Sequence, residues 1–168
     1  MREINFDEIV SKIESLCLSA NVSLADGIVD CYRKALETEE TAMAKSIISD
    51  CIENQKIASE EKVPLCQDTG LAVFFIKVGD EVKIKGGLLS DAVTKGVSLG
   101  YTRGYLRASC LDDPLYERKN TRDNTPPIIH TETVSGDKLE ITFIPKGGGA
   151  ENMSALKMMS PSAGEKGV

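Results

Sequence analysis

One long apolar run organises this sequence: Leu71-Ala72-Val73-Phe74-Phe75-Ile76-Lys77-Val78. Its branched and aromatic side chains are typical of a β-strand, and the Gly79-Asp80 pair that follows is typical of a tight turn. Glu81–Lys85 then alternates polar and apolar residues before Gly86-Gly87. Residues 71–87 are therefore predicted to form a β-hairpin.

A second hairpin is predicted further along the chain. Its strands are Ile128–Val134 and Leu139–Ile144, and Ser135-Gly136-Asp137-Lys138 supplies the turn between them. The second strand runs into Gly147-Gly148-Gly149, after which a short helix is expected.

The first sixty residues show helical periodicity, with apolar positions three and four residues apart. Three helices are predicted there, with inward faces made of Phe6, Ile9, Val10, Ile13, Leu16 and Cys17, then Ile28, Cys31, Tyr32 and Ala35, then Ala44, Ile47, Ile48, Cys51 and Ile52. A fourth follows the first hairpin and presents Leu89, Ala92, Val93, Gly96, Val97, Gly100 and Tyr101 on one face. Helices first and hairpins later indicate a single α+β domain over residues 1–168, with helices packed on a mainly antiparallel sheet.

Composition narrows the classes of partner. The 168 residues include 20 Lys+Arg and 26 Asp+Glu, a formal net charge of -6, which argues against a protein that binds the nucleic-acid backbone. No apolar stretch approaches the roughly 20 residues of a membrane-spanning helix, and residues 1–10 lack the apolar core of a signal peptide. We therefore expect a cytoplasmic protein with neither a nucleic acid nor a membrane as partner.

The cysteines differ in their sequence context. There are five of them and a single histidine, without any Cys-x-x-Cys pair, so neither a disulfide framework nor a zinc ribbon fits. Cys17, Cys31 and Cys51 fall on apolar helix faces and are expected to be small core residues. Cys110 is also read as structural. Cys66 lies on a predicted loop, because it follows Pro64 and precedes the turn formers of residues 68–70.

Three segments collect polar residues that helix faces and strand alternation do not explain: residues 66–70, 103–124 and 147–152. The second contains the cations Arg103, Arg107, Arg118, Lys119 and Arg122. An arginine fork can hold a carboxylate in two parallel hydrogen bonds, and a glycine run before a helix can present backbone N–H groups to an anion. A solvated loop and a flexible strand-to-helix connection remain the alternatives.

Several longer motifs resemble one family, the class I iron–sulfur hydro-lyases, which comprise the class I fumarate hydratases and the α subunit of L(+)-tartrate dehydratase. The motifs are Pro64–Gly70, Gly100–Arg107, Asp113-Pro114-Leu115, Asn120–Pro126 and Lys146–Ser154. The resemblance extends from the N-terminal helices to the last residue. It is specific for the family and much less so for the substrate.

The resemblance implies an active site built around a [4Fe–4S] cluster that three cysteines hold, with one iron open as a Lewis acid for the substrate. It places the first cluster ligand at Cys66. Gln67 and Asp68 are expected to reach the substrate, with Asp68 assisting proton transfer or orienting the base. Arg107 is expected to clamp a substrate carboxylate, to which Gly149 donates a backbone N–H. Arg103, Arg118 and Arg122 remain alternatives to Arg107.

The chain also departs from the family pattern. The family's other two cluster cysteines lie beyond the equivalent of Val168, and the remaining cysteines here sit in no matching motif. We therefore expect the N-terminal part of an α subunit that needs a β subunit or a C-terminal domain, acts on a small dicarboxylate such as fumarate, malate or tartrate, self-associates, and is inactive in isolation. A catalytically silent module for anion binding or subunit assembly is the alternative.

Overall fold

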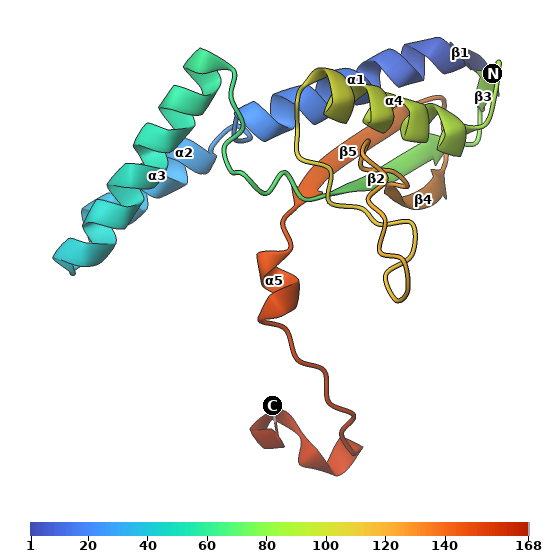
Figure 1. The fold of residues 1–168 in the computed structure, drawn as a ribbon. Helices are drawn as coiled ribbons and strands as arrows, with labels where there is room; N and C mark the ends of the chain where they lie inside the picture. Colours follow the sequence, from blue (N-terminus) through green and yellow to red (C-terminus); the bar gives the residue numbers. More distant parts are fainter. Residues whose placement is uncertain (168) are drawn as a thin grey trace.

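A computed structural model describes residues 1–167 and confirms the α+β class (Figure 1). The elements in chain order are β1 (Arg2–Asn5), α1 (Phe6–Val22), α2 (Ile28–Thr38), α3 (Ala42–Glu61), β2 (Leu71–Gly79), β3 (Val82–Lys85), α4 (Leu89–Arg103), β4 (Ile128–Val134), β5 (Leu139–Lys146) and α5 (Gly149–Asn152), followed by the 3-10 turns Pro161–Ala163 and Glu165–Gly167. Among these residues, none of the helices is both long and apolar enough to cross a membrane.

The predicted strands form, but both predicted hairpins are wrong. The sheet order is β4-β2-β5, so β2 lies between the two strands that were expected to pair with each other. Val73 of β2 faces Ile128 in a parallel pairing and Ile144 in an antiparallel one. β3 pairs in parallel with β1 instead of folding back on β2. The sheets are therefore parallel and mixed rather than mainly antiparallel.

The turn after β2 explains why the hairpins fail to form. Gly79 and Asp80 donate backbone N–H groups to the carbonyls of Lys138 and Val134, and the Asp80 carboxylate accepts from the N–H of Gly136. The Gly79-Asp80 turn is thus bonded to the turn between β4 and β5, which leaves room for β2 between those strands. As the most apolar strand, β2 gains backbone partners along both edges in this position, whereas a hairpin would leave one edge unpaired.

The core lies between the sheet and the two helices α1 and α4, which run along one face of it (Figure 1). Its largest fully buried side chains include Ile9, Ile13, Phe74, Ile76, Val93, Val97 and Tyr101. The predicted inward face of α4 is confirmed, and its glycines let α1 approach closely. A Cβ at Gly96 would lie 2.5 Å from the Ile13 Cβ, and one at Gly100 would lie 2.7 Å from the Cys17 Cβ.

The helices α2 and α3 form an arm that projects away from the sheet (Figure 1). Within α2, whose residues are all described, no side chain is buried, and α3 buries only Ala58. The predicted inward positions are therefore wrong for Ile28 and Cys31, which are exposed, and for Ile47, which is 56% exposed. Two helices that pack mainly on each other cover only the strip along which they touch, so apolar residues outside that strip stay exposed. Cys17 is fully buried as expected, and Cys51 is half-buried.

We predict that Gly96→Ala lowers the free energy of unfolding by about 1–3 kcal/mol, because the new methyl group overpacks the contact with Ile13. Urea denaturation followed by circular dichroism measures this. Thr102→Ala, on the exposed side of α4, is the control and should stay within about 0.5 kcal/mol of the parent. An unchanged midpoint for Gly96→Ala would contradict the close approach of the two helices.

Thiol modification should distinguish the cysteines. Burial raises the pKa of the Cys17 thiol to about 12, and the neighbouring Glu14 charge adds to this, so Cys17 holds almost no thiolate near neutral pH. With iodoacetamide at pH 8, peptide mapping should find adducts on the exposed Cys31 and Cys66, and on Cys17 only after unfolding. Fast modification of Cys17 in the folded protein would contradict its burial.

Candidate active site

The sequence predicted a loop before β2, and the structure has one between α3 and β2. Hydrogen bonds hold this loop at both ends. α3 ends at Lys62, whose φ of 57° is left-handed. The backbone N–H of Leu65 donates to the Asn21 carbonyl at 2.8 Å, and the Leu65 carbonyl accepts from Asn54 Nδ2 at 2.9 Å. These bonds fix the loop between α1 and α3 just before Cys66.

Thr69 and Gly70, at the other end of the loop, are buried. The Tyr101 hydroxyl donates to the Thr69 carbonyl at 2.8 Å, and the Thr69 hydroxyl donates to the Arg107 carbonyl, also at 2.8 Å. Gly70 has a φ of +67°, and a Cβ there would collide with the carbonyl group of Lys146, so the position requires glycine. The core thus determines where Cys66, Gln67 and Asp68 are presented.

Cys66 is exposed at the tip of this loop. Its Sγ accepts the backbone N–H of Asp68 at 3.4 Å, and its thiol donates to the Gln67 Oε1 at 3.6 Å. An N–H directed at sulfur stabilises negative charge there, as hydrogen bonds to the sulfur of a metal-bound thiolate do. Over residues 1–167, however, no three His, Cys, Asp or Glu side chains are grouped so that they could hold a metal ion.

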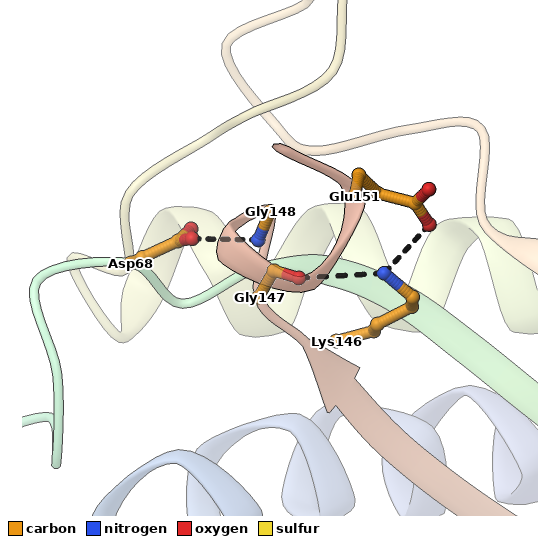
Figure 2. A network of polar contacts seen from close by, with 5 residues as sticks. All are labelled: Asp68, Lys146, Gly147, Gly148 and Glu151. Carbon is orange, nitrogen blue, oxygen red and sulfur yellow. Dashed lines mark hydrogen bonds and ion pairs between the residues drawn. The ribbon is translucent and has the colours of Figure 1, made fainter. Parts of the chain in front are cut away.

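Asp68 links this loop to the glycine run after β5 (Figure 2). Its Oδ2 accepts the Gly148 N–H at 2.8 Å, and its Oδ1 accepts the Gly70 N–H at 3.1 Å. The hydrogen bond from the Gly148 N–H does most to hold the pKa of the Asp68 carboxyl below its ordinary value. Partial burial raises this pKa, whereas the Gly70 N–H and the charges of Arg107 and Lys146 lower it further. Asp68 is therefore a carboxylate at neutral pH.

The sequence suggested that the glycine run at residues 147–149 presents backbone N–H groups to an anion, and only part of the run is available for this. Its Gly148 N–H is already taken by Asp68, whereas nothing lies within 4 Å of the position of a Cβ on Gly149. Lys146 steadies the run, because its Nζ contacts Glu151 Oε1 at 2.7 Å and the Gly147 carbonyl at 3.4 Å (Figure 2). The helix that follows, α5, has only four residues.

Among the four arginines considered, Arg107 is the one whose charge acts on the Asp68 carboxyl. It is exposed, and its charge lowers the pKa of the Asp68 carboxyl. Arg103 instead forms an ion pair with Glu14 at 2.9 Å, and Arg118 donates to the Pro114 carbonyl at 2.9 Å. Arg122 lies in a polar pocket with Lys119 and Asp123, beside Thr94 of α4.

Sequence reasoning assigned no role to Lys146, Tyr101 or Asn124 at this site. Lys146 and Asn124 stand in motifs that the sequence singled out, but neither motif indicates a contact. Asn124 is 0% exposed and donates to the Gly70 carbonyl at 2.9 Å. In the sequence Asn124 looks like an ordinary loop residue, so no sequence signal indicated that its side chain is buried.

Comparison with known proteins agrees with the placement of these motifs. The model of one family, described as fumarate hydratase (Fumerase), matches residues 10–168. A putative L(+)-tartrate dehydratase subunit alpha of Methanocaldococcus jannaschii is 35% identical over 162 residues, which cover 93% of this chain and 56% of that protein. The L(+)-tartrate dehydratase subunit alpha of Escherichia coli K12 is 28% identical over 174 residues, which cover 100% of this chain and 57% of that protein.

This chain therefore spans little more than half the length of these relatives. Because the family model matches nearly all of its residues, the chain belongs to the fumarate hydratase (Fumerase) family.

Proposed function

We propose that this chain is part of an iron–sulfur hydro-lyase that adds or removes water across a C4 dicarboxylate, such as fumarate and malate or tartrate and oxaloacetate. Family membership and the names of the tartrate dehydratase relatives support the reaction class. One structural observation carries it to particular residues: a single anchored loop presents the exposed thiol of Cys66 beside the ionised carboxylate of Asp68, whose pKa the charge of Arg107 helps to lower.

Cys66 is the residue we propose as the cluster ligand. A thiolate is the ligand that iron–sulfur clusters prefer, and the Asp68 N–H already points at its sulfur. When bound, a [4Fe–4S] cluster would supply a Lewis-acidic iron beside this loop. We propose that Cys66 is one ligand of such a cluster; the described residues contain no group of three His, Cys, Asp or Glu side chains that could hold a metal ion.

Asp68 is better suited to orienting a reaction partner than to abstracting a proton from carbon. Both of its oxygens accept backbone N–H groups, and its pKa lies below the ordinary range, so it is a weak base at neutral pH. Its remaining lone pairs can still accept a hydrogen bond from a substrate hydroxyl or from a protonated base. Gln67, exposed beside it, offers an amide that can both donate and accept.

Arg107 and Gly149 are proposed to hold the substrate carboxylates. Removal of a proton next to a carboxylate builds negative charge on that group, which a guanidinium fork or a backbone N–H stabilises. Arg107 is free of the ion pairs that occupy Arg103 and is anchored through its carbonyl by Thr69. The open space around Gly149 allows a ligand to approach its backbone.

A partner is part of this proposal. The relatives are named as alpha subunits, which implies a β subunit or an equivalent domain. We propose that this partner supplies the catalytic groups that this chain lacks, the base above all.

The cluster assignment is tested with the intact protein, reconstituted with iron and sulfide without oxygen. Cys66→Ser should abolish the broad visible absorption of the cluster, because the serine oxygen is a poorer ligand for this iron. Cys31→Ser is the matched control, since Cys31 is equally exposed but lies on the projecting arm, and it should leave the spectrum unchanged. An intact spectrum in Cys66→Ser would refute the ligand assignment.

The carboxylate clamp is tested by steady-state kinetics on the same protein. Arg107→Met should raise KM for the dicarboxylate about tenfold or more, because a charge-assisted hydrogen bond contributes roughly 1.5–3 kcal/mol. Arg118→Met serves as control, because Arg118 is engaged with Pro114, and it should change KM by less than about twofold. Equal effects of the two substitutions would argue against a specific role of Arg107.

A further inference from the structure

The motif Asn120–Pro126 has no role in the site described above, yet it contains the most deeply buried polar residue near it. Asn124 is 0% exposed. Its Nδ2 donates to the Gly70 carbonyl at 2.9 Å, and its Oδ1 accepts the Ser109 N–H at 2.7 Å. Gly70 lies two residues after Asp68, and Ser109 lies two residues after Arg107. One amide group therefore joins the two segments that carry the proposed substrate contacts.

The segment that carries Arg107 has no regular structure of its own. Residues 106–110 belong to neither a helix nor a strand. Their backbone groups are bound instead by the motif: Asn120 Nδ2 donates to the Ala108 carbonyl at 3.0 Å, and the Thr121 N–H donates to the Cys110 carbonyl at 3.0 Å. The Thr69 hydroxyl binds the carbonyl of Arg107 itself. The position of Arg107 thus depends on side-chain contacts rather than on a helix or strand.

The demands on residue 124 are met by asparagine in particular. The position needs a donor for the Gly70 carbonyl, an acceptor for the Ser109 N–H, and a tolerance of the left-handed φ of 61°. Asparagine has both hydrogen-bonding groups on one short side chain and is enriched at positive φ. An ionised aspartate would direct a negative oxygen at the Gly70 carbonyl, and a buried unpaired carbonyl or N–H is costly.

We propose that Asn124 is a positioning residue that sets the separation between Asp68 and Arg107 and thereby selects dicarboxylates by length. This rests on the proposed function, because it takes Arg107 as the clamp for one substrate carboxylate. A diacid with one carbon fewer or more displaces its second carboxylate by about an ångström, and displacements of that size can cost about a hundredfold in rate. Because a rigid link keeps the two segments from adjusting to that displacement, the site disfavours diacids that are shorter or longer than its preferred length.

A neighbouring bond provides the comparison that separates this role from a purely structural one. The Tyr101 hydroxyl donates to the Thr69 carbonyl from α4 and lies near the Asn124 side chain, and the Tyr101 backbone carbonyl accepts the Leu106 N–H at 3.0 Å. Tyr101→Phe removes the hydroxyl but keeps the backbone bond to Leu106 and the bonds of the Asn124 amide to Gly70 and Ser109, so it should weaken the fold while leaving the separation between the two segments unchanged. Removing the Asn124 amide should change that separation.

Asn124→Gly is the variant of choice, because glycine keeps the left-handed backbone and removes only the amide. Lys62→Gly, at another residue with positive φ at the start of the Cys66 loop, is the matched control, because it makes the same backbone change while leaving both bonds of the Asn124 amide in place, and Tyr101→Phe is the comparison. Hydrogen exchange followed by NMR on this chain gives the first readout. The Ser109 amide should exchange at least about tenfold faster in Asn124→Gly and at the parent rate in the other two, because only the first variant removes its acceptor.

Inhibition constants for malonate, succinate and glutarate, measured with the intact protein and its partner, give the second readout. The parent should prefer succinate, and Asn124→Gly should reduce that preference about tenfold or more, whereas Tyr101→Phe and Lys62→Gly should retain it. Retained preference in Asn124→Gly overturns the selection by length. Equal Ser109 exchange in Asn124→Gly and Lys62→Gly overturns the coupling, whatever the inhibition data show. A parent protein that binds none of the three diacids overturns the proposed function itself.

Discussion

The hydrogen bond from the Tyr101 hydroxyl to the Thr69 carbonyl connects the core of this protein to its candidate site. Tyr101 is 1% exposed, and burial raises the pKa of its hydroxyl far above the physiological range, so it is always a donor. Its place is in turn set by the contact of α4 with α1 at Gly96 and Gly100. The packing of two helices therefore decides where the Cys66 loop lies.

The elements of the fold could be predicted from the sequence, but strand pairing could not. The apolar run of β2 and the glycines around it indicate a strand and its end, because they report on the strand's own environment. The partner of a strand depends on long-range hydrogen bonds, such as those between Asp80 and the turn after β4. The local sequence pattern does not indicate such bonds. The same limit applies to Cys31 and Ile47, whose helical spacing is correct although both side chains are exposed.

The candidate site, too, could be predicted from the sequence only in part. The loop, the thiol and the carboxylate were predictable, since Pro64 and the turn formers of residues 68–70 act locally and the motifs resemble a known family. The residues alone did not single out one arginine: only the family resemblance indicated Arg107, and the ion pair of Arg103 with the distant Glu14 cannot be read from the local sequence. The Gly148 N–H belongs to the glycine run that could present N–H groups to an anion; it binds Asp68 instead, a pairing across 80 residues that the sequence pattern does not contain.

Anchoring and ligand binding use different chemistry in this site. The groups that fix the two segments are buried and neutral: the hydroxyls of Tyr101 and Thr69 and the amide of Asn124. Neutral groups with complete hydrogen bonds avoid the desolvation cost that a buried charge would carry. The charges of Arg107 and Asp68 remain at the rim, where a dianion can reach the guanidinium. In a chain of net charge -6, attraction of the proposed dicarboxylate would be local, and salt should weaken it mainly through the exposed Arg107.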